Sequence, residues 1–314
     1  MTATEPEAPA EVPAAQHFGF FALEVLRTRR IGHSFLRVTF GGESLSGFRS
    51  GGYDQSLSLF LPPAGVEHAE LPATGEDTWF AAWRGMPDES RPVMRSYTVR
   101  EQRRTAEGAE ADELDIDFVL HGESSPASHW AGRAVAGSRI MAIGPRVAQN
   151  KSVRFQPEAA EGGLLLMYAD ETALPAAFSI LERLPEAARV RAFFEVPHAE
   201  DRLVPLTPAE AHLTWIVRDE AGPGRTERVV AAVRAAELTG PGDPGTGAPE
   251  GTYAWLAGEA GTVRAVRRHV VQERSVDRRA VRFTGYWRLG ASEEQLLAEA
   301  YAGQAPDEEP DAAL

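Results

Sequence analysis

The chain has 314 residues, enough for two domains of ordinary size, and its hydrophobic fraction of 43% is typical of soluble globular proteins. Its formal net charge of -14 argues against nucleic-acid binding, and no apolar run reaches the length of a membrane helix. The sequence contains no cysteine, which excludes disulfides, thiol nucleophiles and iron–sulfur clusters. Any redox chemistry therefore requires a bound organic cofactor or a metal without thiolate ligands.

Both ends of the chain are expected to be disordered. Residues 1–16 are acidic and rich in Pro and Ala, without the basic start and apolar stretch of a secretory signal. Residues 303–314 form an acidic tail. These features predict a cytoplasmic protein, and a monomer is the default expectation for its oligomeric state.

The first half of the chain has the alternation of antiparallel strands. Runs with this pattern are separated by loops rich in Gly, Pro and charged residues, and they lie at 22–40, 56–62, 95–100 and 114–122. Within 114–120 every second side chain is apolar, while Asp115 and Asp117 face the other way. Strands at this spacing predict a small antiparallel β-barrel over residues 17–157, including a short helix and a strand that ends at Pro145.

The second half alternates between strands and helices. Gly163–Ala169 is a continuous apolar run, as expected of a strand covered on both faces. The pattern predicts further strands at 190–196, 213–218, 253–260 and 280–288, and helices at 172–185, 225–238 and 261–274. This order predicts a doubly wound parallel sheet over residues 160–302. The expected fold is therefore an antiparallel β-barrel followed by an α/β domain.

Several common catalytic and nucleotide-binding motifs are absent from the sequence. There is no GxGxxG after a strand, no Walker-type phosphate loop, no GxSxG and no HExxH. His121 and His129 are eight residues apart, but Gly122 and Pro126 between them prevent a shared helical face. The sequence therefore predicts no metal site.

The stretch "RSYTVR" (Arg95–Arg100) places unusual side chains on one strand. Arg95 and Tyr97 fall on the same face, because successive side chains of a strand point to opposite sides. An arginine beside an aromatic ring is a poor core element. It suits a planar, charged ligand, which can stack on the ring while the guanidinium binds a phosphate.

A turn rich in small residues, "HGESSPASHW" (His121–Trp130), is a candidate anion site. It joins a strand end to a helix start, where backbone N–H groups and the hydroxyls of Ser124, Ser125 and Ser128 can bind an anion. The alternative is that these serines only cap the helix.

Two predicted strand ends in the second half are candidate nucleotide sites. "YADETALP" (Tyr168–Pro175) follows the first parallel strand, with Thr172 as the expected helix N-cap. "WLAGEAG" (Trp255–Gly261) contains two glycines that allow a ligand to approach the backbone closely. Ligands of open α/β sheets bind at the carboxyl ends of the strands, which favours a nucleotide crevice here over simple capping.

Taken together, these segments resemble the siderophore-interacting protein family, the FAD-dependent ferric-siderophore reductases among the ferredoxin-reductase-like flavoproteins. The resemblance extends from about His17 to about Ala302. It is carried, in the order of the family, by "GYDQ", "MRSYTVR", "ELDIDFVLHG", "PASHWA", "IGPR", "DETALPA", "FFEV", "WLAGEAG" and "GYWRLG". Each motif alone is weak, but nine in this order are specific.

The resemblance implies an FAD-binding barrel followed by an NAD(P)H-binding domain. By this comparison Arg95 would pair with the FAD pyrophosphate, Tyr97 would pack against the isoalloxazine and Thr98 would lie near flavin N5. The resemblance also implies Ser96, His121, Ser125, Ala127 and Ser128 on the FAD side. Trp287, together with Tyr286 and Arg288, would approach the flavin from the C-terminal side. The residues implied on the NAD(P)H side are Asp170, Glu171, Thr172, Gly258 and Glu259, with Glu259 near the nicotinamide.

The implied activity is reduction of a ferric siderophore. Hydride would pass from NAD(P)H to FAD, which can then deliver single electrons to Fe(III), whereas nicotinamide delivers two together. This chemistry implies no catalytic acid or base. It implies an exposed flavin and a positive pocket for an anionic chelate, with Arg288, His129, Arg146 and Lys151 as the candidate residues.

Three positions depart from the family pattern. Ser58 stands where relatives commonly have a lysine, His129 replaces the arginine of "PASRW", and Ala169 replaces a glycine. The loss of basic residues leaves three alternatives: a neutral siderophore, compensation by other cations, or a flavin-dependent reductase that serves another acceptor or partner enzyme. A non-catalytic siderophore-binding protein is an alternative of a different class. Arg218, near a strand end, is a candidate for the 2′-phosphate of NADPH, so NADH and NADPH both stay open.

Overall fold

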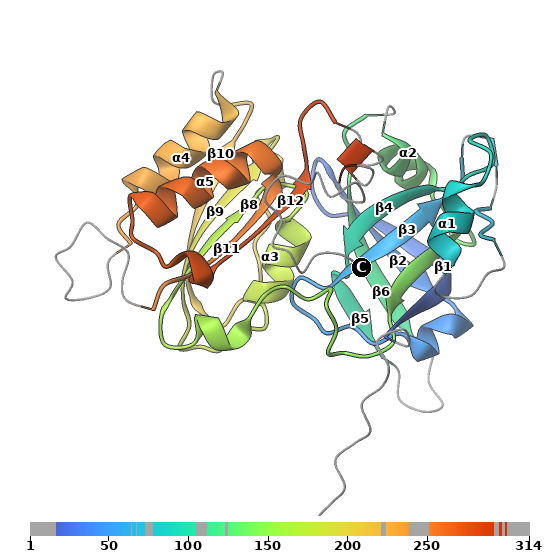
Figure 1. Ribbon diagram of the computed structural model, residues 1–314, viewed down its shortest axis with the longest axis horizontal. Helices are drawn as coiled ribbons and strands as arrows, with labels where there is room; N and C mark the ends of the chain where they lie inside the picture. The colour runs from blue at the N-terminus through green and yellow to red at the C-terminus, as the bar shows by residue number, and fades with distance from the viewer. Residues whose placement is uncertain are drawn as a thin grey trace, which may run out of the picture.

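The structure, a computed structural model, describes residues 17–63, 65–66, 68–72, 78–104, 112–122, 125–220, 224–238, 251–291, 295–296 and 299. The predicted tails at 1–16 and 303–314 lie outside these residues. The described chain forms a seven-stranded sheet and a five-stranded sheet, which lie side by side (Figure 1). In the part of the chain searched, no helix has the length and apolar character needed to cross a membrane.

The first sheet is antiparallel throughout and is curled into a partial barrel (Figure 1). In spatial order its strands are β4 (Val93–Thr98), β3 (Ser56–Leu61), β7 (Arg139–Pro145), β1 (Phe18–Arg30), β2 (Phe35–Gly41), β6 (Glu113–Val119) and β5 (Glu101–Arg103). The predicted alternation in β6 is confirmed. Leu114, Ile116 and Phe118 are in the barrel core, while Asp115 and Asp117 bind arginines on the other face.

Helical segments cover parts of the barrel. The short helix predicted before the last strand is α2 (Pro126–Arg133), which packs Ala127 and Ala131 into the barrel core. Two segments were not predicted from the sequence, η2 (Glu43–Gly47) and α1 (Trp79–Arg84). Helix α1 lies on a separate aromatic cluster, where Trp83 packs with Phe60 and Met94.

The second sheet is parallel, as predicted. Its spatial order is β10 (Glu210–Val217), β9 (Arg189–Val196), β8 (Leu164–Ala169), β11 (Tyr253–Glu259) and β12 (Val281–Trp287). The helices are α3 (Leu174–Leu181), α4 (Arg225–Ala235) and α5 (Ala260–Gln272), with short turns η3 (Pro157–Ala160), η4 (Ala199–Asp201) and η5 (Arg278–Ala280). Helix α3 packs on one face of the sheet and α4 and α5 on the other, which confirms the doubly wound arrangement (Figure 1).

A buried aspartate ties the two sheets together. Asp54 precedes β3, and its carboxylate accepts hydrogen bonds from the backbone N–H groups of Arg154 and Phe155 at 3.0 Å. It also accepts one from Nε1 of Trp255, in β11, at 3.0 Å. Burial raises the pKa of Asp54, while these hydrogen bonds favour its ionised form. The Asp54 side chain thus holds both the segment that connects the two sheets and a strand of the second sheet.

Two further contacts hold the sheets in a fixed arrangement. The Asp201 carboxylate is fully buried and accepts a hydrogen bond from the backbone N–H of Ser34, in the β1–β2 turn, at 2.7 Å. Arg100, just after β4, makes a bidentate ion pair with Glu182, just after α3, at 2.8 and 2.5 Å. The end of β4 is therefore positioned against the parallel sheet.

Candidate functional site

Strand β4 presents Arg95 and Tyr97 on one face, as the alternation predicts. In the register with β3, Arg95 lies opposite Leu59 and Tyr97 opposite Leu57. The Tyr97 ring packs against Phe118 with 4.5 Å between ring centroids, and Arg95 Nη1 donates to the Met94 carbonyl at 2.8 Å. Both side chains are half-buried. A guanidinium and an aromatic ring therefore lie together at the edge of the barrel core.

The end of β4 meets the last strand of the parallel sheet. Thr98 is buried and shares a side-chain hydrogen bond with Tyr286 of β12. Burial is the main reason why the pKa of Tyr286 is raised, so the phenol stays neutral at physiological pH. Ser96 is exposed, on the opposite face of β4 from Arg95 and Tyr97. The structure thus brings together the "RSYT" and "GYW" motifs, which are distant in the sequence.

The turn before α2 is built around Ser128. Its hydroxyl accepts a hydrogen bond from the backbone N–H of His121 at 3.1 Å, and both Ser128 and Ala127 are buried. Ser125 occupies the N-cap position of α2, but its side chain makes no capping hydrogen bond with the described residues. Capping is therefore not the role of these two serines in this structure. Ser124 lies outside the described residues.

The prediction that Thr172 caps α3 is wrong. The helix begins at Leu174, with Ala173 in the cap position. The Thr172 backbone N–H and hydroxyl both donate to Oδ1 of Asp170, at 3.0 and 2.6 Å. Because Asp170 lies only two residues earlier, its carboxylate closes a local turn that draws Thr172 away from the helix start.

Asp170 lies at the centre of the carboxyl edge of the parallel sheet. It is fully buried, and Oδ2 accepts hydrogen bonds from Trp287 Nε1 at 2.8 Å and from the Glu259 backbone N–H at 2.8 Å. Burial, and then the charge of Glu171, raise the pKa of Asp170. Its position indicates that Asp170 supports the ends of β8, β11 and β12 from inside.

The Asp170 side chain also explains why residue 258 is a glycine. This residue has φ +140°, and a Cβ at this position would lie 2.6 Å from Cγ of Asp170. The sequence interpretation, close approach of a ligand, is thus not needed for Gly258, since an internal carboxylate already requires the glycine.

The Glu259 side chain caps the start of α5. Its carboxylate accepts from the Thr262 backbone N–H at 2.7 Å and from that of Leu289 at 3.3 Å. Burial opposes ionisation, but backbone hydrogen bonds, including one from Gly261, lower the pKa of Glu259. A fixed anionic carboxylate therefore lies next to the 286–288 segment.

Two arginines and two glutamates form an ion-pair cluster beside Asp170. Arg218 follows β10 and makes a bidentate pair with Glu171, both contacts at 2.6 Å. Arg225, the first residue of α4, donates to the fully buried Glu195 of β9 at 2.8 Å and to Asp170 at 3.1 Å. The Arg225 guanidinium also lies over the Trp287 ring, 4.9 Å from its centroid.

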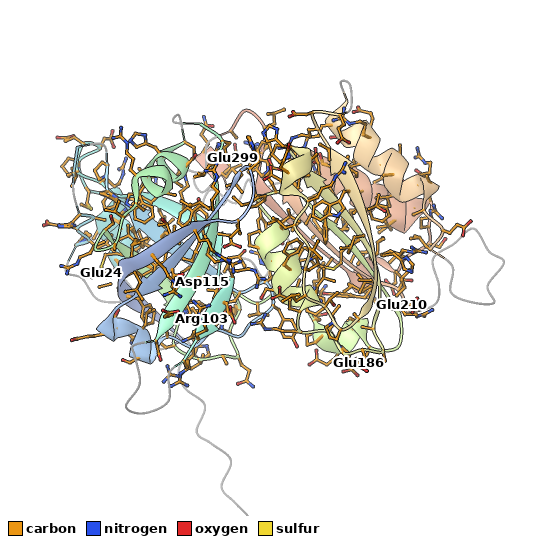
Figure 2. All side chains as sticks on the ribbon, turned by 180° about the vertical axis from the view of Figure 1, so that it is seen from behind. Glu24, Arg103, Asp115, Glu186, Glu210 and Glu299 are labelled. Atoms are coloured by element: carbon orange, nitrogen blue, oxygen red, sulfur yellow. The ribbon has the colours of Figure 1, made fainter. Side chains whose placement is uncertain are left out.

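The four predicted substrate-binding cations come from separate elements. His129 is half-buried on α2, Arg146 follows β7 with its guanidinium close to Gly19, and Lys151 is exposed in the next turn. Arg288 follows β12 and makes a bidentate ion pair with Glu299 at 2.8 and 2.7 Å. Figure 2 shows Glu299 where the two sheets meet. The positive charge of Arg288 is therefore already paired with a carboxylate of this chain.

Three residues of the site had no role in the sequence interpretation. Asp54 stands in the quoted motif "GYDQ" and Glu195 in "FFEV", and these positions are the signals that could have marked them. Arg225 stands in no such motif, and it is 30 residues from Glu195. Only the packing of α4 against the end of β9 makes them partners. Among the described residues no cluster suits a metal ion.

Comparison with known proteins decides the family. Residues 24–149 match the siderophore-interacting FAD-binding domain and residues 163–290 match the siderophore-interacting protein domain. Ferric vibriobactin reductase ViuB of Vibrio cholerae is 32% identical over 88% of this chain and 92% of its own. The chain belongs to the siderophore-interacting protein family.

Other members of the siderophore-interacting protein family agree with this assignment. The NADPH-dependent ferric-chelate reductase of Escherichia coli is 30% identical over 85% of this chain and 92% of its own. The crystal structure of the siderophore-interacting protein SipS from Aeromonas hydrophila is similar with a TM-score of 0.68 and 30% identity, over 92% of this chain and 97% of that one. The expected family and fold class are therefore confirmed.

Proposed function

We propose that this protein is an NAD(P)H-dependent flavoprotein reductase that reduces ferric siderophores and thereby releases Fe(II). The names of the Vibrio cholerae and Escherichia coli relatives support this activity, as does the match to an FAD-binding domain. The structural observation that carries the proposal is the contact of β12 with the barrel side, where Arg154 Nη1 donates to the Thr284 hydroxyl at 2.8 Å and Tyr286, two residues further on, lies against Thr98. This contact places the carboxyl edge of the parallel sheet beside the β4 strand, where two cofactors can meet.

The residues of the barrel fit FAD. Arg95 and Tyr97 share one face of β4 and are half-buried, which suits a pyrophosphate beside an isoalloxazine ring. To the same site we assign Thr98, His121, Ser125, Ala127 and Ser128, and also Ser96 on the opposite face of β4. When bound, FAD can accept a hydride and deliver single electrons. The protein residues bind and orient the cofactor, and none is needed as an acid or base.

The carboxyl edge of the parallel sheet suits the nicotinamide nucleotide. We assign Glu171, Thr172, Gly258 and Glu259 to this side, with Asp170 beneath them and Trp287 at the boundary between the two cofactors. In this proposal residues 17–157 bind FAD and residues 160–302 bind NAD(P)H. The protein is proposed to act in the cytoplasm on a small-molecule chelate, with a monomer as its default state.

A second candidate function is reduction of a different acceptor or partner enzyme. It is favoured by two observations, the serine at position 58 in the middle of β3 and the ion pair that neutralises Arg288. Arg288, His129, Arg146 and Lys151 are proposed to bind an anionic chelate in the first function. They have no such role in the second.

One anaerobic titration tests the proposal. The flavin bands of the purified protein should bleach when NADH or NADPH is added and return when a ferric siderophore is added. Bands that stay bleached with every ferric chelate, but return with quinones or dyes, would favour the second function. A colourless protein that cannot be reconstituted with FAD would contradict both.

A further inference from the structure

The strand order defines how a dinucleotide lies on the parallel sheet. Strand β12 forms one edge and contacts the barrel through Tyr286, whereas β10 forms the opposite edge. On the proposed function, the nicotinamide must reach the flavin beside β4, at the β12 edge. The adenosine end of the nucleotide then extends along the carboxyl ends of the strands toward β9 and β10. A 2′-phosphate on the adenosine ribose would lie toward that end.

The cations at this end of the sheet are already paired. Arg218 makes two contacts of 2.6 Å with Glu171 and approaches Glu195 to 3.5 Å. Arg225 contacts Glu195 at 2.8 Å, Asp170 at 3.1 Å and Glu171 at 3.7 Å. Both arginine side chains are about one-fifth exposed, at 23% and 22%. They would be the natural ligands of a phosphate, because arginine binds phosphate by bidentate, charge-assisted hydrogen bonds.

The charges of the cluster leave no positive excess for a phosphate. Asp170, Glu171 and Glu195 carry three negative charges against the two positive charges of Arg218 and Arg225. The carboxylates of Asp170 and Glu195 are fully buried. If a phosphate took the guanidinium groups, these buried carboxylates would lose their arginine partners, which is strongly unfavourable.

A further arginine of the same helix brings the formal charges near the cluster to an even count. Arg228 lies one turn after Arg225 and is half-buried, and its enclosed Nε and Nη1 atoms make no hydrogen bond to the residues that the structure describes. Even with Arg228 counted, three positive charges stand against three negative ones, so there is still no positive excess.

We propose that this ion-pair cluster makes the protein select NADH over NADPH, and that Glu171 is the residue that determines the selection. Glu171 occupies the Arg218 guanidinium, so the 2′-phosphate finds a carboxylate where it would need a cation. The same side chain is 10% exposed, so its carboxylate can be reached by the 2′-hydroxyl of NADH and accept a hydrogen bond from it. The inference deepens the proposed function, because it names the nucleotide used at the same site.

Nucleotide fragments test the inference without any catalytic turnover. Binding of 5′-AMP and 2′,5′-ADP to the FAD-loaded protein is compared by isothermal titration calorimetry. The wild-type protein should bind 2′,5′-ADP no more tightly than 5′-AMP. Glu171→Gln releases Arg218, so this variant should bind 2′,5′-ADP about tenfold more tightly than the wild type, the typical effect of one charge-assisted hydrogen bond. The double variant Glu171→Gln with Arg218→Ala should lose that gain.

Glu273→Gln is the matched control. Glu273 pairs with Arg234 at the far end of α4, with the nearest contact at 3.1 Å, so it gives the same chemical change away from the nucleotide edge. This variant should leave the affinities for both fragments unchanged. Thermal unfolding of each variant verifies that it is folded. The wild-type comparison needs no variant, so it tests the inference even if Glu171→Gln is unstable.

The outcomes separate this inference from the proposed reductase activity. Wild-type protein that binds 2′,5′-ADP more tightly than 5′-AMP, or bleaches with NADPH as efficiently as with NADH, would overturn the nucleotide selection alone. The same conclusion would follow if folded Glu171→Gln showed the wild-type affinities. Flavin that bleaches with neither nucleotide would overturn the reductase itself.

Discussion

The carboxylate of Asp54 accepts a hydrogen bond from the indole N–H of Trp255 at 3.0 Å, and so joins the loop before β3 to a central strand of the other sheet. The same carboxylate receives the backbone N–H groups of Arg154 and Phe155. A single acceptor thus satisfies three donors in a buried place, where each lost hydrogen bond would be costly. The relative position of the two proposed cofactor sites depends on this residue.

The first prediction concerns Asp54→Asn. The amide keeps the size of the side chain but presents an NH2 group to donors, so at least one buried donor loses its partner. We expect the free energy of unfolding in urea to fall by about 1–3 kcal/mol. The control is Asp88→Asn, which removes an exposed carboxylate paired with Arg91 and should change stability by less than about 0.5 kcal/mol. Equal effects of the two substitutions would contradict the role of Asp54.

Much of the fold follows from patterns that are local in the sequence. Alternation over 114–120 predicts a strand whose apolar side chains share one face, and the apolar run of 163–169 predicts a strand covered on both sides. Both are confirmed, although Asp115 and Asp117 on the other face of β6 are buried as well. The resemblance to a family then adds the order of the two domains. It also predicts that "RSYT" and "GYWR" belong to one site.

Most parts that could not be predicted depend on partners far apart in the sequence. Thr172 is an exception, since it satisfies the local rule for an N-cap but binds the Asp170 carboxylate only two residues earlier. Gly258 looks like a ligand-binding glycine, although Asp170, 88 residues earlier, already excludes a side chain there. The pairing of Arg218 with Glu171 spans 47 residues. On our inference this pairing speaks against Arg218 as a ligand of a 2′-phosphate, because Glu171 already neutralises its guanidinium.

Arg95→Ala should weaken FAD binding. The guanidinium is expected to hold the pyrophosphate by charge-assisted hydrogen bonds, each worth about 1.5–3 kcal/mol, so the Kd for FAD should rise about tenfold or more. The measurement is the ratio of flavin to protein after gel filtration, followed by a fluorescence titration with FAD. Arg84→Ala, on α1, is a control that should retain the yellow colour. If Arg95→Ala retained FAD as the wild type does, the FAD placement would be wrong.

Substitutions at Arg288 and Glu299 should act in opposite directions on an anionic ferric chelate. Arg288→Ala should raise KM, because the chelate loses a cation, while the rate of flavin bleaching by the nucleotide stays unchanged. Glu299→Gln releases Arg288 and should lower KM, by only about two- to fivefold because an exposed ion pair is weak. A neutral ferric chelate should respond to neither substitution. Unchanged KM values with the anionic chelate would mean that its pocket lies elsewhere.

Acid stability should depend on Glu113, in β6. Its carboxylate pairs with Arg27 at 2.5 and 2.6 Å and with Arg103 at 2.8 Å, and these hydrogen bonds, Arg27 first, lower the pKa of Glu113 from 4.5 to about 2. Because the pKa is lower in the folded state, the stabilisation is present above pH 4.5 and is lost as the pH falls toward 2. The stability difference between wild type and Glu113→Gln should therefore be constant near neutral pH and shrink in acid.

Urea unfolding at a series of pH values measures this difference directly. Arg27→Ala should reduce the pH-dependent part without abolishing it, since Arg103 still contacts the carboxylate. Because the pair with Arg27 is partly exposed, added salt should also reduce the difference. A stability difference that stays constant from neutral pH down to pH 2 would show that Glu113 titrates alike in the folded and unfolded chains, and the arginine pairs would then contribute nothing to acid stability.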